Sequence, residues 1–185
     1  TGLFYASANA APTSEVIELA HALYEHKALH TTHMRDEGER IADSLRETFA
    51  IGAEAQIPVV ISHHKCSGAP NHGRSVETLK LIDQASKGQP LGLDAYPYTA
   101  GSTVLSAMRN LLPERVLITW SEPFPEAAGR ELSEIAEELA MSKQEAVEAL
   151  SPGGGIFFMM DEEDVRRILA FPNTMIGSDG LPSDE

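Results

Sequence analysis

Histidine and carboxylate side chains close three of the β-like stretches of this sequence. His33 ends one stretch, His63 ends the next, and Asp179 ends the last. Two neutral imidazoles can hold a zinc ion, and a carboxylate can accept the proton of water that such a metal activates. These residue types at strand ends are therefore typical of metal-assisted hydrolysis. The alternative is that each histidine is a hydrogen-bonded structural residue, but the three groups together favour the metal site.

Strand geometry limits which histidines could act together. Successive side chains of a strand point to opposite faces, so His63 and His64 lie on different faces. His30 and His33 are three residues apart, and on a strand they also point in opposite directions. We therefore do not expect His30 and His33 to chelate a metal from a single strand.

Two other motifs favour structural roles. Gly153–Gly155 lacks the Lys-Ser/Thr pair of a phosphate-binding loop, and with Pro152 it predicts a flexible joint. The acidic run at 161–164 predicts the start of a helix, where the helix dipole favours negative charge, rather than a calcium site.

Strand and helix signals alternate along most of the chain, which predicts an α/β fold with a parallel sheet and right-handed crossovers. The expected parallel strands cover 2–5, 28–33, 57–63, 91–96, 156–160 and 174–179. The expected helices between them cover 13–24, 39–55, 75–87 and 162–169. In a β/α barrel the functional residues lie at the carboxyl ends of the strands, which is where the candidate residues stand.

The alternation breaks in the second half of the chain. A helix over 103–112, a strand over 115–120 and two acidic helices over 130–139 and 142–150 are expected there, the last with a capping box formed by Ser142 and Glu145. We therefore divide the chain into barrel β/α units over 1–103, an insertion segment over 104–152, and further barrel units over 153–185, with the barrel incomplete at both ends.

Composition excludes several classes of protein. The net charge of −14 argues against nucleic-acid partners and anionic membrane surfaces. No apolar run approaches the roughly 20 residues of a membrane span. The single cysteine, Cys66, rules out an internal disulfide and suits a reducing compartment, so we expect a cytoplasmic protein. The acidity is concentrated in residues 101–185, which is typical either of a separate surface lobe or of a solvated acidic face.

Five stretches taken together resemble the D-aminoacylases (N-acyl-D-amino-acid deacylases) of the amidohydrolase superfamily. They are Gly-Leu-Phe-Tyr at 2–5, Thr-His-Met-Arg-Asp-Glu at 32–37, Ile-Ser-His-His-Lys at 61–65, Asp-Ala-Tyr-Pro-Tyr-Thr-Ala-Gly-Ser-Thr at 94–103 and Met-Ile-Gly-Ser-Asp-Gly-Leu-Pro at 175–182. The matches cover nearly the whole chain and occur in the family's order, so the resemblance is specific.

The resemblance implies a (β/α)8 TIM-type barrel with an inserted segment and a zinc site. It assigns His33 and His63 as zinc ligands, Asp179 as the catalytic aspartate, and three substrate-binding residues, Lys65, Tyr96 and Ser102. The family's His-x-His pair, metal-binding cysteine and carboxylate-binding arginine have no match here, and Cys66 does not correspond to that cysteine. A whole barrel needs roughly 250 residues. The resemblance therefore implies that further residues of a longer protein complete the barrel, and that residues 1–185 alone are inactive.

The resulting hypothesis is a zinc-dependent amidohydrolase that converts N-acyl-D-amino acids to a carboxylate and a D-amino acid. The apolar, small residues at 103–108 favour neutral D-side chains, whereas Arg109 could instead select an acidic side chain or simply be a solvated helix residue. The alternatives are an N-acyl-D-glutamate or N-acyl-D-aspartate deacylase, another amidohydrolase, or a non-catalytic α/β interaction module.

Overall fold

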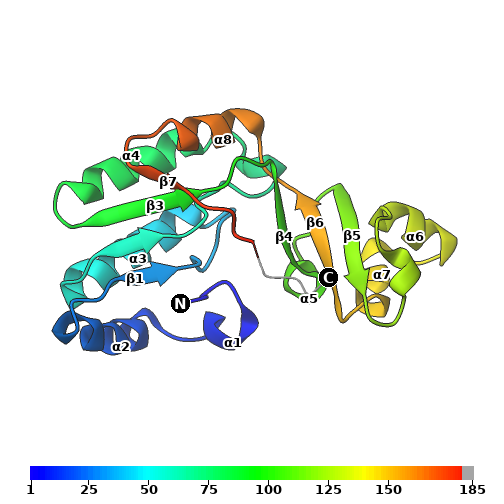
Figure 1. The fold of residues 1–185 in the computed structure, drawn as a ribbon, viewed down its shortest axis with the longest axis horizontal. Coiled ribbons are helices and arrows are strands. Elements are labelled where there is room, and N and C mark those ends of the chain that lie inside the picture. The colour runs from blue at the N-terminus through cyan, green and yellow to red at the C-terminus, as the bar shows by residue number, and fades with distance from the viewer. Residues whose placement is uncertain (181–185) are drawn as a thin grey trace. The chain divides into compact units, whose positions relative to one another are not determined.

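The computed structural model describes residues 1–180 and divides the chain into two compact units (Figure 1). The first unit contains Thr1–Pro97 together with the residues from Asp161 onward, and the second contains Tyr98–Met160. Each unit has its own sheet. The two sheets differ in strand direction, so the units are described separately.

The first unit contains a four-stranded parallel sheet in the order β1-β2-β3-β7. Its strands are β1 (His30–Thr32), β2 (Val59–Ile61), β3 (Leu91–Ala95) and β7 (Thr174–Ile176). This confirms the predicted α/β fold with a parallel sheet. Because all four strands run the same way, the residues that follow them emerge at one edge of the sheet.

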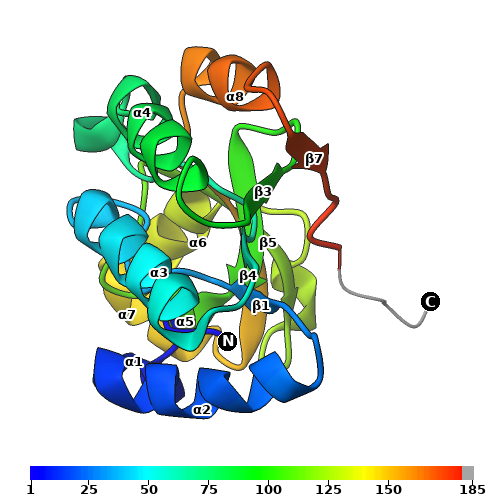
Figure 2. The same cartoon turned by 90° about the vertical axis from the view of Figure 1, so that its left-hand side faces the viewer.

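Helices cover one face of this sheet. Figure 2 shows α2 (Thr13–Glu25), α3 (Ile41–Ala55), α4 (Ser75–Ser86) and α8 (Glu162–Leu169) following one another along it. The unit also contains two short helical segments, α1 (Ala6–Asn9) and η1 (Ala69–Asn71). The helix predictions for this part of the chain are confirmed to within a few residues at each end.

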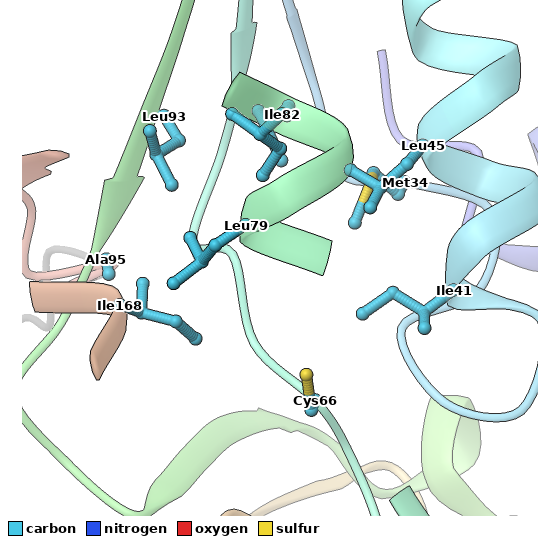
Figure 3. Close-up of a cluster of buried hydrophobic side chains, with 10 residues drawn as sticks. Met34, Ile41, Leu45, Cys66, Leu79, Ile82, Leu93, Ala95 and Ile168 are labelled. Atoms are coloured by element: carbon cyan, nitrogen blue, oxygen red, sulfur yellow. The ribbon is translucent and has the colours of Figure 1, made fainter. Parts of the chain in front are cut away.

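The core lies between these helices and the sheet (Figure 3). Apolar residues four apart in α3, Ile41 and Leu45, meet Leu79 of α4 and Leu93 of β3 in one buried cluster. Full burial of a Leu or Ile side chain contributes about 1.5–3 kcal/mol. Packing of this cluster therefore fixes the strands whose ends carry the candidate site.

The predicted strand over 2–5 is wrong. Gly2 forms only an isolated parallel bridge with His33, in which the Leu3 amide donates to the His33 carbonyl at 3.1 Å. The Tyr5 amide then donates back to the Gly2 carbonyl at 3.1 Å, which turns the chain into α1. The backbone of His33 is therefore hydrogen-bonded to the N-terminal segment that precedes this turn.

The second unit contains a three-stranded antiparallel sheet in the order β4-β6-β5. Its strands are β4 (Ala100–Val104), β5 (Arg115–Ser121) and β6 (Gly153–Phe158), and its helical segments are α5 (Leu105–Met108), η2 (Pro125–Ala127), α6 (Leu132–Glu138) and α7 (Lys143–Ala149). The prediction of a parallel strand over 156–160 is therefore wrong, and of the expected helix over 103–112 only Leu105–Met108 is helical, as α5. The capping box of Ser142 and Glu145 is confirmed.

The predicted flexible joint at Gly153–Gly155 is also wrong, because these glycines are buried residues of β6. A Cβ on Gly153 would lie 2.7 Å from the Leu150 carbonyl oxygen and 2.9 Å from the Trp120 carbonyl oxygen. Backbone atoms cannot move away from an added Cβ as the end of a flexible side chain can. The glycine run is needed for close packing rather than for mobility.

Gly153→Ala should lower the free energy of unfolding by about 1–3 kcal/mol, the usual cost of overpacking a closely packed interior. Gly88→Ala is a matched control, because its Cβ would meet the Ala85 carbonyl oxygen at an ordinary 3.8 Å. Urea unfolding of the full-length protein measures the free energy of unfolding of both variants. The comparison uses midpoints of transitions that share one m-value. Equal midpoints for the two variants would contradict the packing explanation.

Candidate metal centre

The two predicted zinc ligands face each other. His33 follows β1 and His63 follows β2, and the Nδ1 atom of His33 directly contacts the Nε2 atom of His63. The ring centroids are 4.3 Å apart. His63 has a positive φ of 40°, and its backbone amide donates to Asp94 Oδ1 at 2.8 Å. The turn after β2 therefore aims this imidazole at His33.

The chemistry of this pair fits a metal ion. Burial lowers the pKa of His33, and the neighbouring His63 lowers it further, while Asp179 and Glu37 act in the opposite direction. A neutral imidazole keeps one nitrogen lone pair free, and zinc binds this form. The facing nitrogens of His33 and His63 can share a metal ion.

A largely buried carboxylate that the sequence pattern did not indicate lies behind His63. Glu37 Oε1 is 2.9 Å from His63 Nδ1, and both Glu37 oxygens accept hydrogen bonds from Lys65 Nζ, at 2.8 and 2.9 Å. Burial alone would raise the pKa of Glu37, but Lys65 and His63 bring it down to about 2. Lys65 is itself buried, and a buried ammonium needs a counter-charge, which Glu37 supplies.

Lys65 and Tyr96, two of the predicted substrate-binding residues, lie in the same cluster. Lys65 Nζ is 5.6 Å from the centroid of the Tyr96 ring, which is 6.5 Å from that of His63. Burial raises the pKa of Tyr96, and the nearby carboxylates of Glu37 and Asp179 add to this effect. The phenol therefore stays protonated at neutral pH and can donate a hydrogen bond.

Asp179 and Ser102 occupy different settings. Asp179 is exposed, lies three residues after β7 with a φ of 52°, and its charge acts on both His33 and Tyr96. Ser102 lies on β4 of the second unit, with an exposed side chain opposite Ile156 of β6. The first unit thus brings together the predicted site residues other than Ser102, and the roles of all these residues stay predictions.

Two further residues near the site, His64 and Cys66, are buried. His64 is buried, and its Nε2 lies 2.9 Å from Thr78 Oγ1. Cys66 is buried, and burial raises the pKa of its thiol to about 12, which leaves it protonated. Within residues 1–180 no group of three His, Cys, Asp or Glu side chains is placed to hold a metal, and no helix is long and apolar enough to cross a membrane.

The parallel sheet with imidazole, ammonium, phenol and carboxylate groups at its strand ends is typical of the amidohydrolases. No family model matches the chain. Three curated enzymes from Alcaligenes xylosoxydans xylosoxydans match all 185 residues. A D-aminoacylase is 58% identical and is covered over 38% of its length; an N-acyl-D-aspartate deacylase is 47% identical and covered over 37%; an N-acyl-D-glutamate deacylase is 41% identical and covered over 38%.

Solved structures show the same similarity. A crystal structure of D-aminoacylase, described as defining a novel subset of amidohydrolases, is 57% identical with a TM-score of 0.94, over 97% of this chain and 38% of that one. A structure from work on the binuclear metal centre of D-aminoacylase is 56% identical with a TM-score of 0.92, over 96% and 38%. An N-acyl-D-glutamate deacylase from Bordetella bronchiseptica, complexed with zinc and a phosphonate inhibitor, is 39% identical with a TM-score of 0.90, over 96% and 38%.

The predicted resemblance to the D-aminoacylase family is confirmed by these comparisons. The chain is similar along its whole length to one segment of such enzymes and spans about 38% of the length of the first relative. The matched proteins are enzymes, which favours the deacylase hypothesis over the non-catalytic module.

Proposed function

We propose that the full-length protein is a zinc-dependent hydrolase that removes the acyl group from N-acyl-D-amino acids. The observation that carries this proposal is the pair of facing nitrogens, His33 Nδ1 and His63 Nε2, at neighbouring strand ends. The names of the matched relatives supply the substrate class.

His33 and His63 would hold the metal, and further ligands would come from the part of the protein outside residues 1–185. Zinc is present in the N-acyl-D-glutamate deacylase structure, and D-aminoacylase has a binuclear metal centre. When bound, the metal would lower the pKa of the attacking water and polarise the amide carbonyl. We further propose that the first unit, Thr1–Pro97 with the residues from Asp161 onward, belongs to a (β/α)8 barrel into which Tyr98–Met160 is inserted, and that the protein is cytoplasmic.

Three side chains would carry out the steps around the scissile amide. Asp179 would take the proton from the attacking water and return it to the leaving amine nitrogen. The protonated phenol of Tyr96 would donate a hydrogen bond to the developing oxyanion. Lys65 would bind the substrate carboxylate, assisted by Ser102.

N-acyl-D-amino acids with a neutral side chain are the favoured substrates. Arg109, the nearby cation that could select an acidic side chain, forms an ion pair with Glu148 within the second unit. The D-aminoacylase relative is also more similar, at 58%, than the deacylases named for acidic substrates, at 47% and 41%.

The full-length protein with zinc should hydrolyse N-acetyl-D-leucine with a higher kcat/KM than N-acetyl-D-glutamate. The small, apolar residues at 103–108 favour the leucine side chain, and a substrate carboxylate bound without a counter-charge is disfavoured, so the two kcat/KM values should differ by at least about tenfold. Initial rates over a range of substrate concentrations measure this difference, with N-acetyl-L-leucine as the control for stereochemistry. A kcat/KM that favours the glutamate substrate would contradict neutral specificity, and hydrolysis of the L-isomer at an equal rate would contradict the substrate class.

A further inference from the structure

One carboxylate serves two functional side chains at once. Glu37 lies between His63 and Lys65, and the side chains of all three are at most 10% exposed. The two partners have different proposed roles, metal ligation for His63 and substrate binding for Lys65. Glu37 itself is assigned no role by the proposed mechanism.

The neighbours of His63 Nδ1 allow two tautomers of the ring. Lys65 Nζ lies 2.6 Å from Nδ1, and Glu37 Oε1 lies 2.9 Å from the same atom. If Nε2 carries the proton, Nδ1 accepts a hydrogen bond from the lysine. If Nδ1 carries the proton, it donates to the glutamate, and the Nε2 lone pair faces His33.

Only the second tautomer can ligate a metal through Nε2. A carboxylate behind a metal-binding histidine favours this form, because it accepts the Nδ1 proton and holds the ring in place. A neutral acceptor would do so less strongly, since hydrogen bonds to an ionised group are about twice as strong. The choice of tautomer thus depends on the charge of Glu37 as well as on its position.

The same carboxylate keeps the lysine ammonium in place. Both Glu37 oxygens accept hydrogen bonds from Lys65 Nζ. Without this counter-charge, the buried ammonium would be left unpaired, which is energetically costly and would favour a shift of its position. Removing the charge of Glu37 should therefore affect both metal binding and substrate binding.

We propose that Glu37 is a positioning residue that selects the Nε2-ligating tautomer of His63 and anchors the ammonium of Lys65 for the substrate carboxylate. This inference rests on the proposed function, because it gives a role to the groups behind the metal site. It predicts a coupled loss: one substitution weakens zinc binding and raises KM.

The test uses Glu37→Gln in the full-length protein, with Glu39→Gln as a matched control. Glu39 is exposed and two residues away, so the control removes the same charge without touching the cluster. Competition with a chromophoric chelator should show zinc binding weakened about 10- to 100-fold in Glu37→Gln, the range seen when partners behind metal ligands are removed. KM for N-acetyl-D-leucine should rise, and the control should match the wild type in both measurements.

Glu37→Asp and the wild type itself give the remaining readouts. The aspartate keeps the negative charge, so its zinc affinity should lie between those of Glu37→Gln and the wild type. In zinc-loaded wild type with 15N-labelled histidine, NMR should show His63 protonated at Nδ1. This measurement does not depend on the folding of any variant.

Wild-type zinc affinity in folded Glu37→Gln, or a His63 ring that carries its proton on Nε2, would overturn the proposal. Absence of N-acyl-D-amino-acid hydrolysis would instead overturn the proposed function, because zinc affinity and the NMR signal do not depend on turnover.

Discussion

Asp179→Asn in the full-length protein should retain zinc and lose at least about 100-fold in kcat. The amide side chain has nearly the shape of the carboxylate but cannot take up a proton from water, and general acid–base catalysis typically contributes 100-fold or more. Steady-state kinetics with N-acetyl-D-leucine, together with zinc analysis of the same preparation, measure the two quantities.

Asp83→Asn is the control for this substitution. Asp83 lies on α4 and forms an exposed ion pair with Lys87, and such pairs contribute little to stability. We expect the kcat of the control to lie within about twofold of the wild type, because substitutions of exposed residues usually have small effects. A kcat near normal in Asp179→Asn would contradict the role of proton carrier, and loss of zinc would show that Asp179 acts as a ligand instead.

His63→Ala should abolish stoichiometric zinc binding and, with it, the zinc-dependent hydrolysis. The substitution removes one of the two facing nitrogens and leaves Glu37 and Lys65 without their shared imidazole partner. Zinc content after extensive buffer exchange, read beside circular dichroism to show that the fold persists, measures the effect.

His21→Ala is the matched control for the histidine. His21 is an exposed residue of α2, so its removal should leave the zinc content unchanged. One zinc per chain in folded His63→Ala would contradict the assignment of this residue as a ligand.

The parallel sheet and the site at its edge could be predicted because both follow from local patterns. β-branched stretches alternating with amphipathic helices indicate parallel strands, and parallel strands place their carboxyl ends together. The sequence therefore predicts that His33 and His63 lie near each other, and their rings are in contact in the structure. The boundaries of the elements differ by a few residues because strand ends depend on tertiary hydrogen bonds.

The role of Glu37 could not be predicted from spacing. It stands 26 residues before His63 and 28 before Lys65 in the sequence, and nothing local to residue 37 indicates that the fold buries it between them. The antiparallel pairing of β6 could not be predicted for a related reason. A short apolar stretch indicates a strand but carries no information on the direction of its partner, and the sequence of Gly153–Gly155 does not reveal the close contacts with Trp120 and Leu105.

One measurement most directly tests the proposal that the two facing imidazoles are part of the zinc site of a D-specific deacylase. It is a zinc titration of the metal-free, full-length protein with N-acetyl-D-methionine and N-acetyl-L-methionine as parallel substrates. We expect release of D-methionine to begin on addition of zinc, to be reversed by a chelator, and to exceed release of L-methionine greatly. Release of D-methionine at the same rate with and without zinc, or no release at any zinc concentration, would contradict the zinc site and the proposed function together.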